Sequence, residues 1–239
     1  MKKRNILDTP IDFDKSDFFS LLSLSVGASY SWQNAMGALV IGNSGWNVDV
    51  RERTIRFGDR SFPCGILGSE NTSEGTWLWG WANTESNLPD MFLAPSRRAK
   101  RALPFVPEFS EGKFMLDEIH TGHNLAMVSV GVSEKNVCYY RCPIDDALSI
   151  FVQIEELPDE VFAPLPLDEL AKIYLRVISS FYCDHRLLAA GFLYQNGYDF
   201  SENGAVMTAR SGGRELTFAF EEIEGLCRVC DVSVLDMSE

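Results

Sequence analysis

The segment from Phe18 to Val48 contains no charged residue, and this uncharged run constrains the fold more than any other feature of the sequence. Its 31 residues are numerous enough to cross a bilayer as a helix, so a membrane segment is one interpretation. However, serine, glutamine and asparagine side chains interrupt the run, and its apolar positions recur at helical spacing between Phe18 and Tyr30. We therefore expect a buried amphipathic helix over residues 16–38 rather than a membrane span.

The composition is that of a globular protein whose core is large enough to be stable on its own. Hydrophobic residues make up 46% and charged residues 23% of the 239 residues, and a chain of this length needs neither a disulfide nor a metal to fold. The N-terminal Met-Lys-Lys-Arg is typical of a signal peptide, but Asp8, Asp12 and Asp14 occupy the positions where its apolar segment would follow. The six cysteines are accordingly expected to be free thiols, and we predict a soluble cytoplasmic protein.

The charge of the chain argues against one class of partner. A formal net charge of −13 is unfavourable for binding nucleic acid without sequence preference, because such binding needs a cationic face that displaces counterions from phosphates. Residues 144–239 hold 18 acidic residues and only 6 Lys and Arg residues. This acidic part is either a solvated surface or a face that attracts a basic protein partner.

Alternating apolar and polar positions predict short strands between amphipathic helices. Besides the first helix, we expect helices that begin at Leu88 and near Glu111, and a long helix over residues 167–190. The expected strands cover residues 46–57 as a hairpin, 62–68, 76–81, 125–132, 137–141, 148–154, 205–210, 215–220 and 226–234. Short turns join them, which favours antiparallel pairing. We predict a single α+β domain over residues 1–239, with a mostly antiparallel sheet, helices packed on one face and weak helix-plus-strands repeats near 16–81, 111–154 and 167–234.

The stretch from Thr76 to Asn83 reads TWLWGWAN and places three tryptophans at alternate positions. In a strand, Trp77, Trp79 and Trp81 would lie on one face and cover a large apolar area. They either form the core beneath the helices or serve as an aromatic platform for a ligand or partner. Asn83 would end the strand, where a turn or a helix cap is favoured over a catalytic role.

These residues also carry a resemblance. Gly68-Ser69-Glu70, the tryptophan stretch and Leu88-Pro89 resemble the signature of a bacterial family known only as a domain of unknown function, whose members have a TWLWAWAN core. Gly80 stands where that core has alanine. The resemblance extends more loosely through His123-Asn124-Leu125-Ala126, Tyr140-Arg141-Cys142-Pro143 and Asp184-His185-Arg186. It implies no activity, cofactor or catalytic residue, because the family has none assigned.

The spacing that most suggests a metal site combines His120 and His123 with Cys227 and Cys230. A structural zinc site needs a tetrahedral set of converging ligands. Cys227 and Cys230, however, fall in an expected strand, in which residues three apart face opposite sides. We therefore predict ordinary thiols, no metal and no cofactor.

The sequence shows no established catalytic motif. Cys183-Asp184-His185 supplies a nucleophile, an acid and a base, but neighbouring residues of a helix point in different directions and cannot form a relay. A nucleophile elbow, a phosphate-binding loop and a dinucleotide fingerprint are all absent from the sequence. We predict no catalytic residues, and the alternative is a ligand-binding protein or enzyme with a pocket beside the tryptophan strand.

Two charged clusters are candidate contact surfaces. The basic run Arg97–Arg101 is explained by the preference for cations at a helix C-terminus, or else it binds an anionic partner or the protein's own acidic part. Glu155, Glu156, Asp159 and Glu160 form an expected exposed group in a loop, where contact residues are common. The leading hypothesis is a non-catalytic binding module, immunity-like in masking a basic protein, whose oligomeric state the sequence leaves open.

Overall fold

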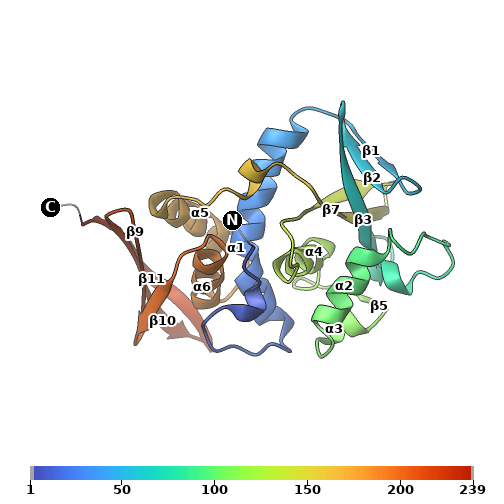
Figure 1. The fold of residues 1–239 in the computed structure, drawn as a ribbon. Helices are drawn as coiled ribbons and strands as arrows, with labels where there is room; N and C mark the ends of the chain where they lie inside the picture. The colour runs from blue at the N-terminus through green and yellow to red at the C-terminus, as the bar shows by residue number, and fades with distance from the viewer. Residues whose placement is uncertain (1–2, 238–239) are drawn as a thin grey trace. The chain divides into compact units, whose positions relative to one another are not determined.

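Two antiparallel sheets and their helices make up the structure, a computed structural model that describes residues 3–237 (Figure 1). The chain divides into two compact units. One is Trp32–Phe162, and the other combines the residues before Trp32 with those from Ala163 onward. The α+β class and the antiparallel pairing predicted from the sequence are confirmed, with the strands shared between two sheets. The single domain with internal repeats stays a prediction.

The Trp32–Phe162 unit contains a seven-stranded sheet. Its strands are β1 (Trp46–Asp49), β2 (Thr54–Phe57), β3 (Arg60–Asn71), β4 (Thr76–Trp79), β5 (Lys113–Met115), β6 (Cys138–Pro143) and β7 (Leu148–Ile154). The order is β1-β2-β3-β4-β5, with β7 pairing both β3 and β6. The predicted hairpin is confirmed, because Trp46 pairs with Phe57 and Asp49 with Thr54. The 12 residues of β3 organise the sheet, since the first part of this strand pairs with β2 and the rest pairs with β7, while Gly68–Asn71 also pair with β4.

The helices of this unit are α2 (Ala94–Ala102), α3 (Pro107–Ser110) and α4 (Gly122–Gly131). α4 corrects two predictions: residues 125–132 are helical rather than a strand, and the segment from Glu111 forms β5 and a loop rather than a helix. A short apolar run suits a buried helix and a buried strand equally. The Thr121 hydroxyl favours the helix, because it accepts a hydrogen bond from the Asn124 N–H at 3.1 Å and so caps the first turn.

The other unit contains a four-stranded sheet in the order β11-β10-β9-β8. Its strands are β8 (Phe200–Asn203), β9 (Val206–Ser211), β10 (Arg214–Ile223) and β11 (Leu226–Asp236), and its helices include α5 (Leu167–Ser180) and α6 (His185–Gln195). The two helices pack against this sheet, in which Leu216, Phe218 and Phe220 are buried. Gly212 and Gly213 form the predicted turn between β9 and β10, with φ values of 58° and 75° that glycine adopts without strain.

The long helix predicted over residues 167–190 is in fact two helices, α5 and α6. The helical conformation ends at Phe181 and begins again after Asp184. The Asp184 carboxylate accepts hydrogen bonds from the Leu187 N–H at 2.9 Å and from the Cys227 N–H at 3.0 Å, so it caps α6 and ties this helix to β11. The apolar periodicity runs through both helices, and only the cap marks the break between them.

α1 (Phe18–Met36) confirms the first predicted helix and continues as a π-helical turn, Gly37–Ile41. The backbones of α1 and α6 come so close that a Cβ at Gly191 would lie 2.1 Å from the Leu24 carbonyl oxygen. A residue without a side chain is therefore required at position 191. Among residues 3–237, no helix combines the length and the apolar character needed to cross a membrane.

Candidate functional site

The predicted aromatic platform belongs mostly to the core. Trp77 and Trp79 lie in β4 and are completely buried. Their rings meet edge to face with centroids 5.2 Å apart, and the packing continues from Trp77 to Phe151 and from Trp79 to Phe109. The Trp79 Nε1–H donates to the Glu108 carbonyl oxygen at 2.6 Å, which satisfies this indole inside the core. No ligand can stack on these two rings while the sheet is folded.

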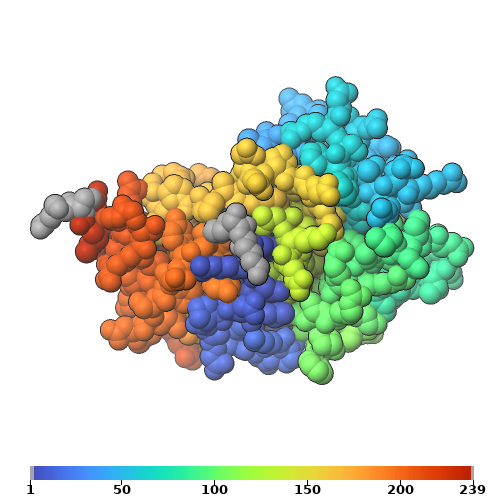
Figure 2. Space-filling view, viewed as in Figure 1, coloured from blue at the N-terminus to red at the C-terminus, as the bar shows by residue number. Residues whose placement is uncertain are grey.

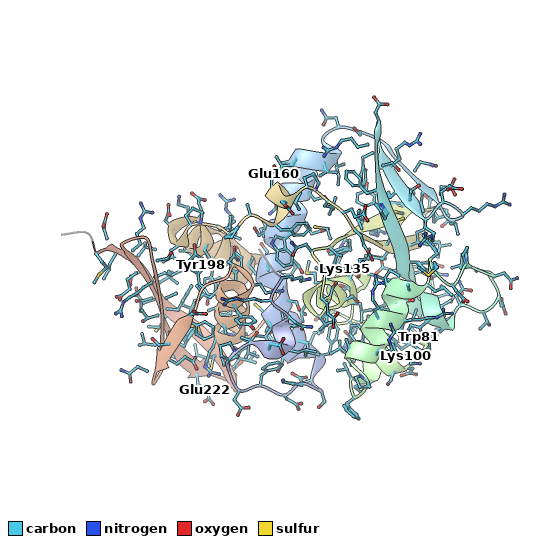
Figure 3. The ribbon with its side chains drawn as sticks, in the orientation of Figure 1. Trp81, Lys100, Lys135, Glu160, Tyr198 and Glu222 are labelled. Atoms are coloured by element: carbon cyan, nitrogen blue, oxygen red, sulfur yellow. The ribbon has the colours of Figure 1, made fainter. Side chains whose placement is uncertain are left out.

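Trp81 departs from the predicted strand. It lies in the 3-10 turn Gly80–Ala82, so the expectation of three tryptophans on one strand face is wrong for this residue. The Lys100 ammonium group lies 3.4 Å from the centroid of the half-buried Trp81 ring, a cation–π contact between the turn and α2 (Figure 3). Asn83 has the predicted turn role, because its side-chain oxygen accepts a hydrogen bond from the Ser86 N–H at 3.2 Å.

A polar cluster that the sequence pattern did not single out lies at the edge of the aromatic core. It consists of Glu70 on β3, His123 in the first turn of α4, and Tyr139 and Arg141 on β6. The His123 ring packs edge-on against Phe151, with centroids 5.2 Å apart. Its Nδ1 lies 3.0 Å from the Tyr139 hydroxyl, and the Arg141 Nε lies 3.6 Å from the Glu70 carboxylate. A carboxylate, an imidazole, a phenol and a guanidinium thus converge beside the start of α4.

The surroundings of His123 favour its neutral form. Desolvation lowers the pKa of His123, the Glu70 carboxylate opposes this effect, and the Arg141 guanidinium adds to it. Burial raises the pKa of the Tyr139 hydroxyl far above its usual range, so this hydroxyl stays protonated beside His123 Nδ1. Which of the two groups donates in this hydrogen bond depends on the tautomer of the imidazole. The cluster therefore combines a neutral imidazole with a phenol that keeps its proton.

Four of the segments that carry the family resemblance meet around this cluster, whereas Asp184-His185-Arg186 belongs to the other unit. Glu70 pairs in register with Trp77, and Arg141 pairs with Phe151. His123 comes from a third segment, which covers the sheet as α4. The spacing of residues along the chain does not predict this cluster, because sheet pairing brings its members together from distant segments. In the sequence, the motifs of the family resemblance contain Glu70, His123 and Arg141.

The four residues of the predicted acidic contact group differ in exposure and in partners. The Glu155 side chain is only 19% exposed, and its carboxylate pairs with Arg98 Nη2 and with Lys135 Nζ, each at 2.6 Å. Burial would raise the pKa of Glu155, but the hydrogen bonds and charges of Lys135 and Arg98 hold it below its usual value. The expectation that Glu155 is exposed is therefore wrong, and its role as a contact residue stays a prediction. One arginine of the basic run binds the protein's own acidic part, which was one of the alternatives.

Glu156, Asp159 and Glu160 are exposed, and we call these three residues the acidic segment. Within the part of the chain that the structure describes, their carboxylates have no hydrogen-bond or ion-pair partner. Leu157 and Val161 are buried between and beside them and anchor the backbone. Figure 2 shows this part of the chain in yellow on the surface of its unit, and Figure 3 labels Glu160. The acidic segment thus holds three carboxylates without partners, one in a loop at Glu156 and two in the first turn of the 3-10 helix Asp159–Phe162.

His120 and His123 have separate partners. The two ring nitrogens of His120 lie 2.8 Å from Asp117 and 3.1 Å from Glu108, so two carboxylates enclose this ring, whereas His123 contacts Tyr139. All six cysteines are free thiols. Cys230 is the unpaired residue of a β-bulge in β11, opposite Ala219 and Phe220. Over residues 3–237, no group of three or more His, Cys, Asp or Glu side chains is arranged to hold a metal ion.

A hollow of about 540 Å³ lies in the unit that contains the second sheet. It is lined by Pro166, Leu167, Asp168, Tyr198, Ser211, Gly212 and Arg214. The Arg214 guanidinium pairs with the Asp168 carboxylate at 2.6 Å, and the Tyr198 hydroxyl, labelled in Figure 3, donates to the Leu165 carbonyl oxygen at 2.7 Å. The charged groups of the hollow are therefore already paired, and none of its lining residues comes from the tryptophan strand.

Comparison with protein families matches residues 20–157 to a family of unknown function. The match covers more than half of the chain and includes the polar cluster, α2 and Glu156. No curated protein and no solved structure matches the chain.

Proposed function

Because the chain belongs to the family of unknown function DUF6882, whose description assigns no activity, we propose from the structure that it is a non-catalytic binding module. The module acts in the bacterial cytoplasm and binds a basic protein through the acidic segment. The observation that supports this proposal best is the presentation of three unpaired carboxylates on an anchored segment of the chain. An immunity-like role, in which the module masks a basic surface of its partner, fits this chemistry.

The filled aromatic core favours a binding module over an enzyme. Trp77 and Trp79 are completely buried, so neither ring is open to a substrate. In the polar cluster, the Tyr139 hydroxyl occupies His123 Nδ1. Neither arrangement supplies an activated nucleophile or a base within reach of one.

The acidic segment has two properties of a contact surface that accelerates association. Its carboxylates are exposed, so they act on an approaching partner through solvent. Leu157 and Val161 are buried and hold the loop in place, so little conformational entropy is lost on binding. Glu155 strengthens this anchor through Arg98 and Lys135.

The test compares two triple variants of equal net charge. The protein is used to capture partners from a native lysate at low and at high salt, and the salt-sensitive partner is then purified for kinetic measurements. E156K/D159K/E160K should slow association with that partner about tenfold at low salt, with a shallower salt dependence, because exposed charges act mainly on the association rate. Circular dichroism should show an unchanged fold.

The matched control is E52K/D59K/E85K, which reverses three exposed carboxylates elsewhere in the same unit. It should leave the association rate nearly unchanged. If both variants slow association equally, the effect belongs to net charge and not to the acidic segment. If no salt-sensitive partner is captured, or if the first variant binds at the wild-type rate, the proposal is wrong.

A further inference from the structure

The exposed side of α2 is strongly basic. Arg97, Lys100 and Arg101 are three and four residues apart and lie on one side of the helix, while Arg98 reaches Glu155. Arg97 pairs with the exposed Asp90 at 2.9 Å, and Lys100 covers Trp81. Arg101 is exposed and has no ion-pair partner among residues 3–237. The helix dipole favours cations in this last turn. It does not explain why the aromatic ring of Phe105, three residues beyond the helix, is exposed.

Phe105, just beyond α2, has the most exposed large hydrophobic side chain of residues 3–237, at 84%. Its neighbours Leu103 and Val106 are both buried, and the Val106 N–H donates to the Leu103 carbonyl oxygen at 3.3 Å. Pro104 and Pro107 further restrict the backbone. The ring is therefore held in solvent by a fixed backbone, an arrangement typical of an aromatic residue that anchors a protein contact.

The chemistry of this surface selects its partner. Cations beside an exposed aromatic ring and the Trp81–Lys100 pair suit carboxylates and apolar side chains. A polyphosphate also suits cations, but it has no apolar group that could pack on the exposed Phe105 ring. An acidic protein segment that contains apolar residues is the occupant that satisfies both features.

We propose that Trp81, Arg97, Lys100, Arg101 and Phe105 form a second docking surface, which binds an acidic segment of a partner protein. An apolar side chain of that segment packs on Phe105, and its carboxylates pair with Arg97 and Arg101. This docking surface is independent of the acidic segment and of the function proposed for it.

The probe is a fluorescein-labelled peptide of Asp and Glu with leucines at i and i+4, titrated with the full-length protein and followed by anisotropy. F105S and R97Q/R101Q should each weaken binding about tenfold, which corresponds to ~1.4 kcal/mol. The matched controls are M115S and R51Q/R56Q, which change exposed residues of the same unit, and both should bind like the wild type. A peptide with serine in place of leucine should bind as weakly to the wild type as the original peptide binds to F105S.

E156K/D159K/E160K separates the two proposals, because it should bind the acidic peptide at least as tightly as the wild type. Failure of the wild type to bind the peptide at about 1 mM would overturn the proposal, as would binding that neither F105S nor R97Q/R101Q weakens. Tighter binding of a single-stranded oligonucleotide would also overturn it in favour of nucleic acid. Loss of self-association in F105S, seen by sedimentation, would assign the surface to a second copy of this chain instead.

Discussion

The Arg98 guanidinium donates to the Glu155 carboxylate at 2.6 Å, across 57 residues of sequence. Lys135 binds the second oxygen of the same carboxylate, also at 2.6 Å. Charges that the sequence presents as two separate clusters therefore partly neutralise each other. What remains exposed is the acidic segment after Glu155 and the basic side of α2, where Arg97 pairs with the exposed Asp90 and Arg101 has no ion-pair partner among residues 3–237.

The Glu155 contacts should make stability depend on pH. E155Q should lower the free energy of unfolding by about 1 kcal/mol at neutral pH, because a half-exposed ion pair contributes little more. The native pKa of Glu155 lies below its ordinary value of 4.5, so its contribution is complete above about pH 4.5 and is lost as the pH falls through the native pKa. Urea unfolding at several pH values should therefore show the two proteins converging in acid. A constant difference, or an equal effect of the exposed-site control E156Q, would contradict this account.

Trp77 should contribute more to stability than Trp81, although both belong to the same short stretch. Trp77→Ala removes a completely buried indole from contact with Trp79 and Phe151 and should cost about 3–5 kcal/mol. Trp81→Ala removes a half-exposed ring and should cost about 1 kcal/mol. Chemical denaturation of both variants measures the difference. Equal losses would mean that Trp81 is as much a part of the core as Trp77.

The pKa of His123 should respond in opposite directions to its two charged neighbours. E70Q removes a carboxylate that raises the pKa and should lower it further, whereas R141Q should raise it. The native pKa lies below the ordinary value of 6.5, so the stability contributed by the neutral ring is complete above about pH 6.5 and is lost as the pH falls. Nuclear magnetic resonance of the ring nitrogens should give the pKa of His123 in each protein. A wild-type pKa above 6.5, or shifts in the same direction in both variants, would contradict this account.

Removing the Asp184 carboxylate should lower the free energy of unfolding more than removing the carboxylate of an exposed aspartate. D184A removes the acceptor for the Leu187 and Cys227 N–H groups and should cost about 1–2 kcal/mol. The control is D199A, whose carboxylate is almost completely exposed beside Arg4. Thermal unfolding of the two variants should give a clearly larger loss for D184A. Equal losses would show that α6 does not need its cap.

The six thiols should react with a soluble disulfide reagent in the order of their exposure. Cys230 is exposed and should react first, and the half-buried Cys227, whose pKa burial raises, should follow. Burial raises the pKa of Cys64, Cys142 and Cys183 to about 12, so their thiolates are scarce at neutral pH. Mass spectrometry of peptides after brief labelling identifies the modified residue. Early labelling of Cys64 would contradict the buried position of β3.

The local pattern of the sequence was sufficient for most strands and for the first helix. The hairpin from Trp46 to Phe57, the strand Leu148–Ile154 and the turn at Gly212 and Gly213 arise from alternation and turn residues that lie next to each other in the chain. Residues 125–132 were wrongly expected to form a strand, because an apolar run has no periodicity that separates the two structures.

What the sequence by itself determined was the α+β class, the antiparallel pairing and the aromatic composition of the core, since each depends on residues within one turn or one strand. Only the tertiary structure decided which charges remain free. It paired the partly buried Glu155 with Arg98, left Glu156 exposed one residue later, and gathered Glu70, His123 and Arg141 around one helix start. The physical reason is that pairing, desolvation and exposure depend on distances between segments far apart in the chain, which sheet register sets and sequence spacing does not contain.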